Sequence, residues 1–277
     1  STDGKSFLVT NGEIYNYPEL CNDYLSTISL ESTSDTEVLL YLLKLKGAEA
    51  IPLLNGMFAF AFWDQTKQQV ILARDPVGQK PLFYYFGKNS FVFSSDLSSL
   101  AANPDVPLDI DPEALAHYLF FESFPHPYTP LKGVNKLAPG QFMILDLQKW
   151  TLKNKQYWSN PLILSDTVAN ESHYLDIFEQ KFDNALERHL RSDVDVGIFL
   201  SGGLDSPSLV KAACKLRGGE AIKTFTIRHE IDSFNEAHHA REIAQFFGTQ
   251  HHERLLTKED LLASVQLLLK QMDEPIA

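Results

Sequence analysis

The pattern of apolar and polar positions changes once along the chain. Up to about residue 155, short aromatic and β-branched runs alternate with Gly, Asn and Asp; these runs are 7–9, 57–63, 70–73, 82–86, 91–93 and 142–145. Such runs are typical of antiparallel strands. One helix is predicted to begin at a capping box, Ser34-Asp-Thr-Glu37, and another after Asp111-Pro112. The first part is therefore predicted to be an α+β fold of stacked antiparallel sheets with flanking helices.

After residue 170 the apolar positions recur every three or four residues from Tyr174 to Leu190, which predicts a long amphipathic helix. Strands are then predicted at 194–200, 222–227 and 251–256, alternating with helices at 205–216, 236–247 and 261–269. Such alternation is typical of a parallel sheet, so this part is predicted to be an α/β doubly wound fold. A polar stretch at 156–170 is the predicted linker between domains 1–155 and 171–277.

Composition narrows the functional classes. The chain has 277 residues, 44% of them hydrophobic, which is enough for two domain cores. Its formal net charge of -12 leaves no cationic surface for nucleic acid. No apolar run reaches the length of a membrane-spanning helix, and no signal segment opens the chain. Cys21 and Cys214 fall in different predicted domains, so no disulfide framework is indicated and a cytoplasmic setting is expected.

The strongest chemical signal is a hydrophobic strand that runs into Ser201–Ser206, called the phosphate loop below, and then into a helix. Its two glycines let backbone amides turn toward an anion, the helix start adds partial positive charge, and its two serines add hydroxyl donors. The loop lacks the lysine of a Walker loop, and the carboxylate of Asp205 would repel a phosphate unless Mg²⁺ lay between them. A tight structural turn is the alternative to this magnesium–phosphate site.

The phosphate loop resembles the PP-loop of the ATP pyrophosphatases. Four upstream segments resemble successive motifs of class II glutamine amidotransferases: Asn11-Gly-Glu-Ile-Tyr-Asn16, Ser34-Asp-Thr-Glu37, Leu54-Asn-Gly-Met-Phe-Ala-Phe-Ala61 and Ala73-Arg-Asp-Pro-Val-Gly78. Segments 137–140, 157–158, 225–227 and 248–253 extend the likeness over essentially the whole chain. Both sets of motifs in this order resemble the family of glutamine-hydrolysing asparagine synthetases.

The resemblance implies an Ntn-hydrolase-like glutaminase in the first domain. The side chain of Asn11 and the amide of Gly12 match the oxyanion hole of the family, where developing negative charge is stabilised. Glu13 and Asp35 match the carboxylates that bind the α-ammonium group of glutamine. Considered alone, Asn11-Gly12 would suit a hairpin turn, and Asp35 an ordinary first helical turn. Arg74-Asp75 is interpreted as a structural loop with no catalytic part.

In the second domain the resemblance implies conversion of aspartate to asparagine through a β-aspartyl-adenylate, with ATP and Mg²⁺ required. The expected ATP-binding residues belong to a strand end, the phosphate loop and the next strand: Phe199, Leu200, Ser201, Gly202, Gly203, Leu204, Asp205, Ser206 and Ile227. Asp205 is also expected to hold Mg²⁺ through the pyrophosphate group. Ile227 suits a plain core position equally well, because buried strands are rich in isoleucine.

Two features leave alternatives open. Neither Cys21 nor Cys214 matches the nucleophilic cysteine at the start of the family's mature chain, so the N-terminal end of the enzyme is expected to be missing. The chain also stops before the family's next Ser-Gly-Glu-Gly-type motif, so the C-terminal end is expected to be missing as well. One alternative is an amidotransferase of the same architecture that acts on another carboxylate, such as a polysaccharide, cell-wall or β-lactam-type precursor. The other is a non-catalytic nucleotide-binding remnant. A homodimer is a further expectation, and glutamine, aspartate and ATP are the expected small-molecule partners.

Overall fold

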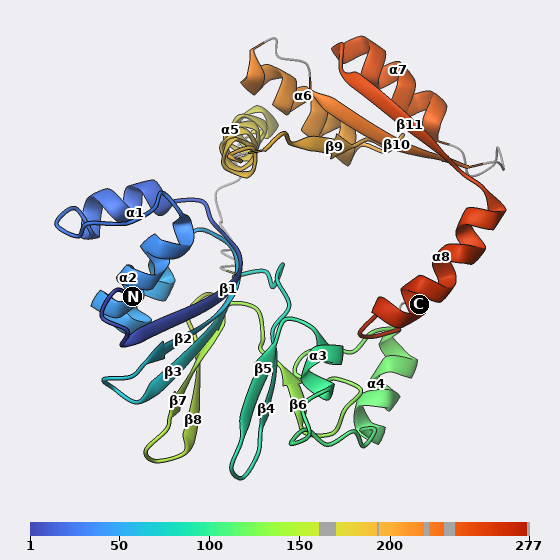
Figure 1. Cartoon of the computed structure of the whole chain (residues 1–277). Coiled ribbons are helices and arrows are strands. Elements are labelled where there is room, and N and C mark those ends of the chain that lie inside the picture. Colours follow the sequence, from blue (N-terminus) through green and yellow to red (C-terminus); the bar gives the residue numbers. More distant parts are fainter. Residues whose placement is uncertain (161–169, 193, 219–221, 230–235, 276–277) are drawn as a thin grey trace. The chain divides into compact units, whose positions relative to one another are not determined.

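A computed structural model describes residues 1–160, 170–192, 194–218, 222–229 and 236–275 (Figure 1). Contacts divide the chain into two compact units, residues 1–162 with 272–277, and residues 163–271. The linker predicted at 156–170 lies largely outside the described residues. The domain boundaries at residues 155 and 170 therefore stay a prediction.

The first unit contains two antiparallel sheets. The larger has the order β1-β2-β3-β7-β8 and consists of β1 (Ser6–Ile14), β2 (Gly56–Asp64), β3 (Gln69–Arg74), β7 (Gln141–Asp146) and β8 (Thr151–Gln156). The smaller has the order β5-β4-β6 and consists of β5 (Phe91–Ser94), β4 (Phe83–Phe86) and β6 (Val134–Lys136). Every aromatic run predicted to be a strand is one. The hydrophobic pattern missed β8 because it is a mostly exposed edge strand of polar residues.

Some helices of this unit pack on the larger sheet, and others flank the smaller sheet. They are α1 (Tyr17–Tyr24), α2 (Asp35–Lys46), a 3₁₀ helix at Gly47–Leu53, α3 (Leu97–Ala101) and α4 (Pro112–Phe121). The apolar face of α2 buries Leu39 and Leu42 against Phe58 and Phe60 of β2. Because β2 alternates its side chains between the two faces of the sheet, it can contribute to more than one core.

The predicted capping box at the start of α2 is only half correct. Ser34 is the N-cap residue, but its hydroxyl accepts a hydrogen bond from the amide of Thr36, at 3.2 Å. Glu37 does not bond back to Ser34. Its carboxylate instead accepts from the amides of Glu31 and Ser32, at 2.9 and 2.7 Å. The chain before the helix folds back over the first turn and brings these donors to Glu37. The hydrogen bond from the Ser32 hydroxyl, at 2.6 Å, and those from the two amides lower the pKa of Glu37.

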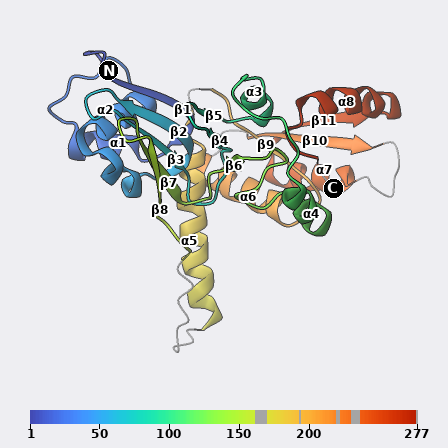
Figure 2. The same ribbon diagram turned by 90° about the horizontal axis from the view of Figure 1, so that it is seen from below.

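The second unit is built around a parallel sheet. Its elements are α5 (Glu171–His189), β9 (Gly197–Phe199), α6 (Asp205–Arg217), β10 (Lys223–His229), α7 (Ala237–Phe247), β11 (Gln250–Leu256) and α8 (Lys258–Gln271). The strand order is β11-β10-β9, and both pairs are parallel. Helices α6 and α7 cover one face, where Leu200, Val210 and Ala240 form a buried cluster (Figures 1 and 2). The predicted succession of antiparallel sheets and a helix-covered parallel sheet is confirmed.

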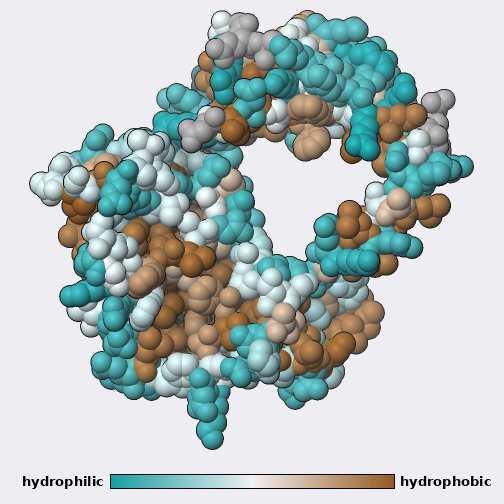
Figure 3. All heavy atoms as spheres, viewed as in Figure 1, coloured by the Kyte–Doolittle hydropathy of each residue, from teal (hydrophilic) through white to brown (hydrophobic). Residues whose placement is uncertain are grey.

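Several apolar side chains are exposed in the described part of the chain. On the face of β9 and β10 opposite to α6, Phe199 is 78% and Ile227 is 52% exposed. Leucines and phenylalanines also lie at the surface of α4 and α8, at the lower right and right of Figure 3. None of the described helices combines the length and the apolar character needed to cross a bilayer.

Candidate functional site

Asn11 and Gly12 lie inside strand β1 and not in a hairpin turn. Gly12 has a φ of +144° and pairs with Phe58 of β2. A Cβ atom on Gly12 would lie 2.0 Å from the carbonyl oxygen of Met57 and 2.7 Å from the Cα of Phe58. Such distances exclude any side chain at this position. The glycine is therefore required by the close approach of two strands, and the side chain of its neighbour Asn11 is exposed beside it.

Asp35 of α2 is brought to the end of β1 that carries the predicted glutamine-binding residues. Its Oδ2 accepts a hydrogen bond of 2.8 Å from the amide of Ile14, the residue after Glu13. The carboxylate of Glu13 is exposed at this strand end. The structure thus places Asn11, Gly12, Glu13 and Asp35 within one short region, although they come from two elements.

The Arg74-Asp75 segment supports this region from the other side of β2. Asp75 is fully buried, and its carboxylate accepts hydrogen bonds from the amides of Phe58, Val77, Gln79 and Lys80 at 2.9 to 3.3 Å. Its own amide donates to the carbonyl oxygen of Phe58, at 2.8 Å. Phe58 is the residue paired with Gly12. The geometry therefore agrees with a structural loop, one that holds the strand opposite Gly12.

The phosphate loop leads from β9 to α6, as its glycines and serines predicted. Ser206 Oγ lies 2.9 Å from Ser201 Oγ and accepts a hydrogen bond of 2.9 Å from the amide of Ser201. The amide of Gly203 donates to Ser201 Oγ at 3.4 Å. The amide of Gly202 donates to Oε2 of Glu236, at 3.1 Å. The turn is thus closed by its own serines and by one carboxylate from the start of α7.

A cavity of about 460 Å³ opens at the carboxyl ends of β9 and β10. Its lining residues are Phe199, Leu200, Ser201, Phe225, Thr226, Ile227, His229 and Glu236. Ligands of open α/β sheets bind at this end of the strands, and the volume lies in the range of small-molecule sites. Four of the predicted ATP-binding residues line it, and the half-exposed Ile227 is one of them. Gly202, Gly203, Leu204, Asp205 and Ser206 continue from the cavity into the first turn of α6.

The donor set at the loop suits a magnesium ion that is shared with a ligand. Asp205 begins α6, and its side chain is exposed. Among the described residues, no group of three or more His, Cys, Asp or Glu side chains could hold a metal ion alone. Mg²⁺ is commonly held by one or two carboxylates together with substrate phosphates. Asp205 would therefore supply a carboxylate to an ion whose other ligands include the phosphates and water.

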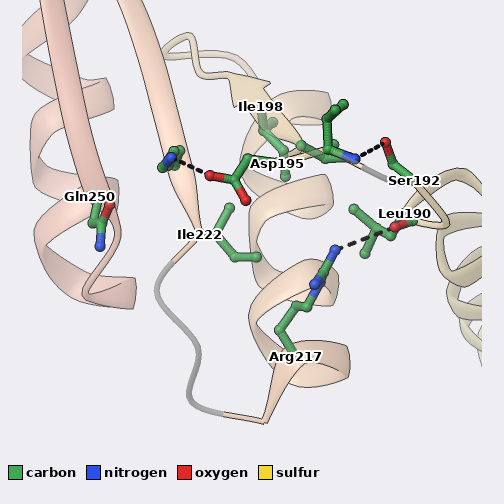
Figure 4. A pocket seen from close by; sticks show the side chains of 10 residues that line it. Leu190, Ser192, Asp195, Ile198, Arg217, Ile222 and Gln250 are labelled. Atoms are coloured by element: carbon green, nitrogen blue, oxygen red, sulfur yellow. Dashed lines mark hydrogen bonds and ion pairs between the residues drawn. The ribbon is translucent and has the colours of Figure 1, made fainter.

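A second cavity, of about 330 Å³, lies at the opposite end of the same strands (Figure 4). Lys223 pairs there with Asp195 at 2.6 Å, and Arg217 donates to the carbonyl oxygen of Leu190, at 3.3 Å. These charges are satisfied within the protein. None of the predicted site residues lines this cavity, and it lies at the amino ends of the strands, away from the phosphate loop.

Several residues that line the cavity at the carboxyl ends of β9 and β10 are not among the predicted site residues. Phe225 and Thr226 belong to a segment that was part of the resemblance, but they were given no role. His229 and Glu236 carried no motif. The available signal for Glu236 was its position at the start of a predicted helix in an alternating strand–helix pattern, because helix starts that follow parallel strands meet at one edge of the sheet.

Comparison with known proteins finds a different family model for each of the two parts of the chain. The family model described as glutamine amidotransferase domain matches residues 1–158, and that described as asparagine synthase matches residues 178–277. The glutamine-hydrolyzing asparagine synthetase 1 of Bacillus subtilis is 33% identical over 99% of this chain and 43% of its own length. A relative from Methanocaldococcus jannaschii is 32% identical over 97% of this chain and 52% of its own length. The chain thus spans about half the length of these relatives.

A solved structure titled as the allosteric regulatory enzyme of purine biosynthesis covers 90% of this chain and 60% of its own, with 14% identity and a TM-score of 0.38. The two family models define a class of proteins in which a glutamine amidotransferase domain precedes a synthase domain. The chain belongs to the family of glutamine-hydrolysing asparagine synthetases.

Proposed function

We propose that the protein converts aspartate to asparagine, using ATP and the ammonia released from glutamine. The observation that carries the proposal is the cavity at the carboxyl ends of β9 and β10, which is continuous with the phosphate loop. The match of residues 1–158 to a glutamine amidotransferase domain supports glutamine as the source of ammonia. AMP, pyrophosphate and glutamate would be the other products.

In the first domain, Asn11 and Gly12 would stabilise the oxyanion that forms when the amide of glutamine is attacked. A side-chain amide and a backbone amide are suitable donors, and their fixed positions on β1 mean that little reorganisation is needed. Glu13 and Asp35 would bind the α-ammonium group through charge-assisted hydrogen bonds. The amide of Ile14 donates a hydrogen bond to the Asp35 carboxylate, which orients this carboxylate at the strand end.

In the second domain, the adenosine part of ATP would occupy the cavity beside Phe199, Leu200 and Ile227. The amides and hydroxyls of the phosphate loop would bind the pyrophosphate portion, and Asp205 would face the accompanying Mg²⁺. This ion would neutralise phosphate charge, while the loop orients the α-phosphorus toward the carboxylate of aspartate. We further propose a cytoplasmic enzyme, and a homodimer stays a prediction.

The choice of aspartate is tested by incubating the complete protein with ATP, Mg²⁺, glutamine and a panel of carboxylic acids while pyrophosphate release is measured. We expect release with aspartate. Release with another carboxylate, and none with aspartate, would assign the protein to an amidotransferase of the same architecture. No release with any acid, together with no ATP binding, would contradict the enzyme function.

Replacing Asn11 with alanine is expected to lower glutaminase turnover by about a hundredfold or more, because one oxyanion donor is lost. Asn11 is exposed, so the fold should be retained. The measurement is glutamate production by the complete protein. Asparagine formation from added ammonium salts is the control and should be unchanged. A loss of both activities would show that Asn11 has another role.

Replacing both Asp205 and Ser206 with alanine is expected to weaken the binding of Mg-ATP at least about tenfold, since charge-assisted contacts contribute roughly 1.5–3 kcal/mol each. Isothermal titration calorimetry measures this change. Ser208→Ala is the matched control, because Ser208 lies in α6 beyond the loop and its hydroxyl donates to the carbonyl oxygen of Leu204. Equal affinity in the double variant and the parent would refute the proposed nucleotide site.

A further inference from the structure

Glu236, at the start of α7, is the one carboxylate that bonds to a backbone amide of the phosphate loop among the described residues. Its Oε2 accepts a hydrogen bond of 3.1 Å from the amide of Gly202. Packing of α7 against the loop keeps the two groups together, because a Cβ atom on Gly202 would lie 3.2 Å from the Cβ atoms of both Glu236 and His239. The first turn of α7 therefore lies against the loop, and this brings the exposed carboxylate of Glu236 within reach of the Gly202 amide.

Two neighbouring amides of the loop have neutral partners. Those of Ser201 and Gly203 donate to serine hydroxyls of the loop itself. Only the amide of Gly202 is bonded to an anionic group, and glycine at this position is what would let a phosphate oxygen approach the backbone. A carboxylate oxygen and a phosphate oxygen are both strong acceptors, so they compete for the same N–H group.

We propose that Glu236 is an anionic placeholder, which holds the amide of Gly202 when the loop is empty and must release it to a phosphate oxygen. This inference rests on the proposed function of the loop in binding ATP. A carboxylate only a few ångströms from a phosphate repels it, and a divalent cation between them removes the repulsion. Glu236 would thereby make the loop select the magnesium complex of a pyrophosphate group over the metal-free anion.

The test measures the binding of inorganic pyrophosphate to the complete protein by calorimetry, once with Mg²⁺ and once with EDTA. Glu236→Gln removes the charge but keeps a side-chain oxygen that can accept the hydrogen bond from Gly202. Without metal, this variant is expected to bind pyrophosphate roughly tenfold more tightly than the parent, because the repulsion is gone. With Mg²⁺ its affinity should change little. The preference for the magnesium complex should therefore fall roughly tenfold.

Glu242→Gln is the matched control, because Glu242 is an exposed residue of the same helix and the change in net charge is identical. It should keep the parent's preference for magnesium pyrophosphate. The inference is overturned if Glu236→Gln also keeps this preference, or if it loses binding with and without metal, which would make Glu236 a structural support. If the parent itself binds neither pyrophosphate nor ATP, the proposed function fails as well.

Discussion

Replacing Asp75 with alanine is expected to destabilise the first unit by about 3–5 kcal/mol, which is as large as the effect of breaking a buried ion pair. The variant would leave the amides of Phe58, Val77, Gln79 and Lys80 without the buried carboxylate that they share. Unsatisfied buried donors carry a full desolvation cost. Water could reach some of them only if the turn opened, which would itself release the strand opposite Gly12.

Urea denaturation followed by tryptophan fluorescence measures this effect. All three tryptophans of the chain, Trp63, Trp150 and Trp158, lie in the first unit, so their fluorescence reports its unfolding. Asp105→Ala is a suitable control because Asp105 is exposed, and a change within about 0.5 kcal/mol is expected there. A loss below about 1 kcal/mol for Asp75→Ala would show that the hydrogen bonds of the carboxylate do not stabilise the fold.

The elements of this fold were predictable where one chemical pattern dominates a segment. Strand β2 is almost entirely apolar, and α6 begins within the phosphate loop, at Asp205, so local sequence suffices to place both. Strand β8 could not be found in this way, because an exposed edge strand has no apolar face to reveal it. Its place in the sheet depends on pairing with β7, which is a contact between segments and not a local property.

The candidate sites show the same limit. The phosphate loop is a contiguous motif, so its position between a strand and a helix could be predicted from local sequence. Glu236 reaches the loop across 34 residues, and Asp35 reaches Ile14 across 21. Neither contact follows from spacing, because it is the packing of α7 and α2 on their sheets that creates it. For Gly12, the sequence suited a turn as well as an oxyanion hole, and the pairing of β1 with β2 excludes the turn.

Replacing Gly12 with alanine is expected to cost about 3–5 kcal/mol of stability in the same fluorescence-detected unfolding. The new Cβ atom would meet the carbonyl oxygen of Met57 at 2.0 Å and the Cα of Phe58 at 2.7 Å. Both are backbone atoms of the paired strand, so no side-chain rotation can relieve the overlap. The strands must separate locally, which would also displace the amide proposed to stabilise the oxyanion.

Gly4→Ala isolates the steric part of this effect from backbone strain. Gly4 also has a positive φ, of +66°, but a Cβ atom there would meet nothing within 4 Å. That variant should therefore lose only about 1 kcal/mol, the usual cost of placing alanine in a left-handed conformation. If both variants lost the same stability, the close approach of β1 and β2 would contribute nothing. A much larger loss in Gly12→Ala would show that the position tolerates only glycine because of the opposing strand, independently of any catalytic role.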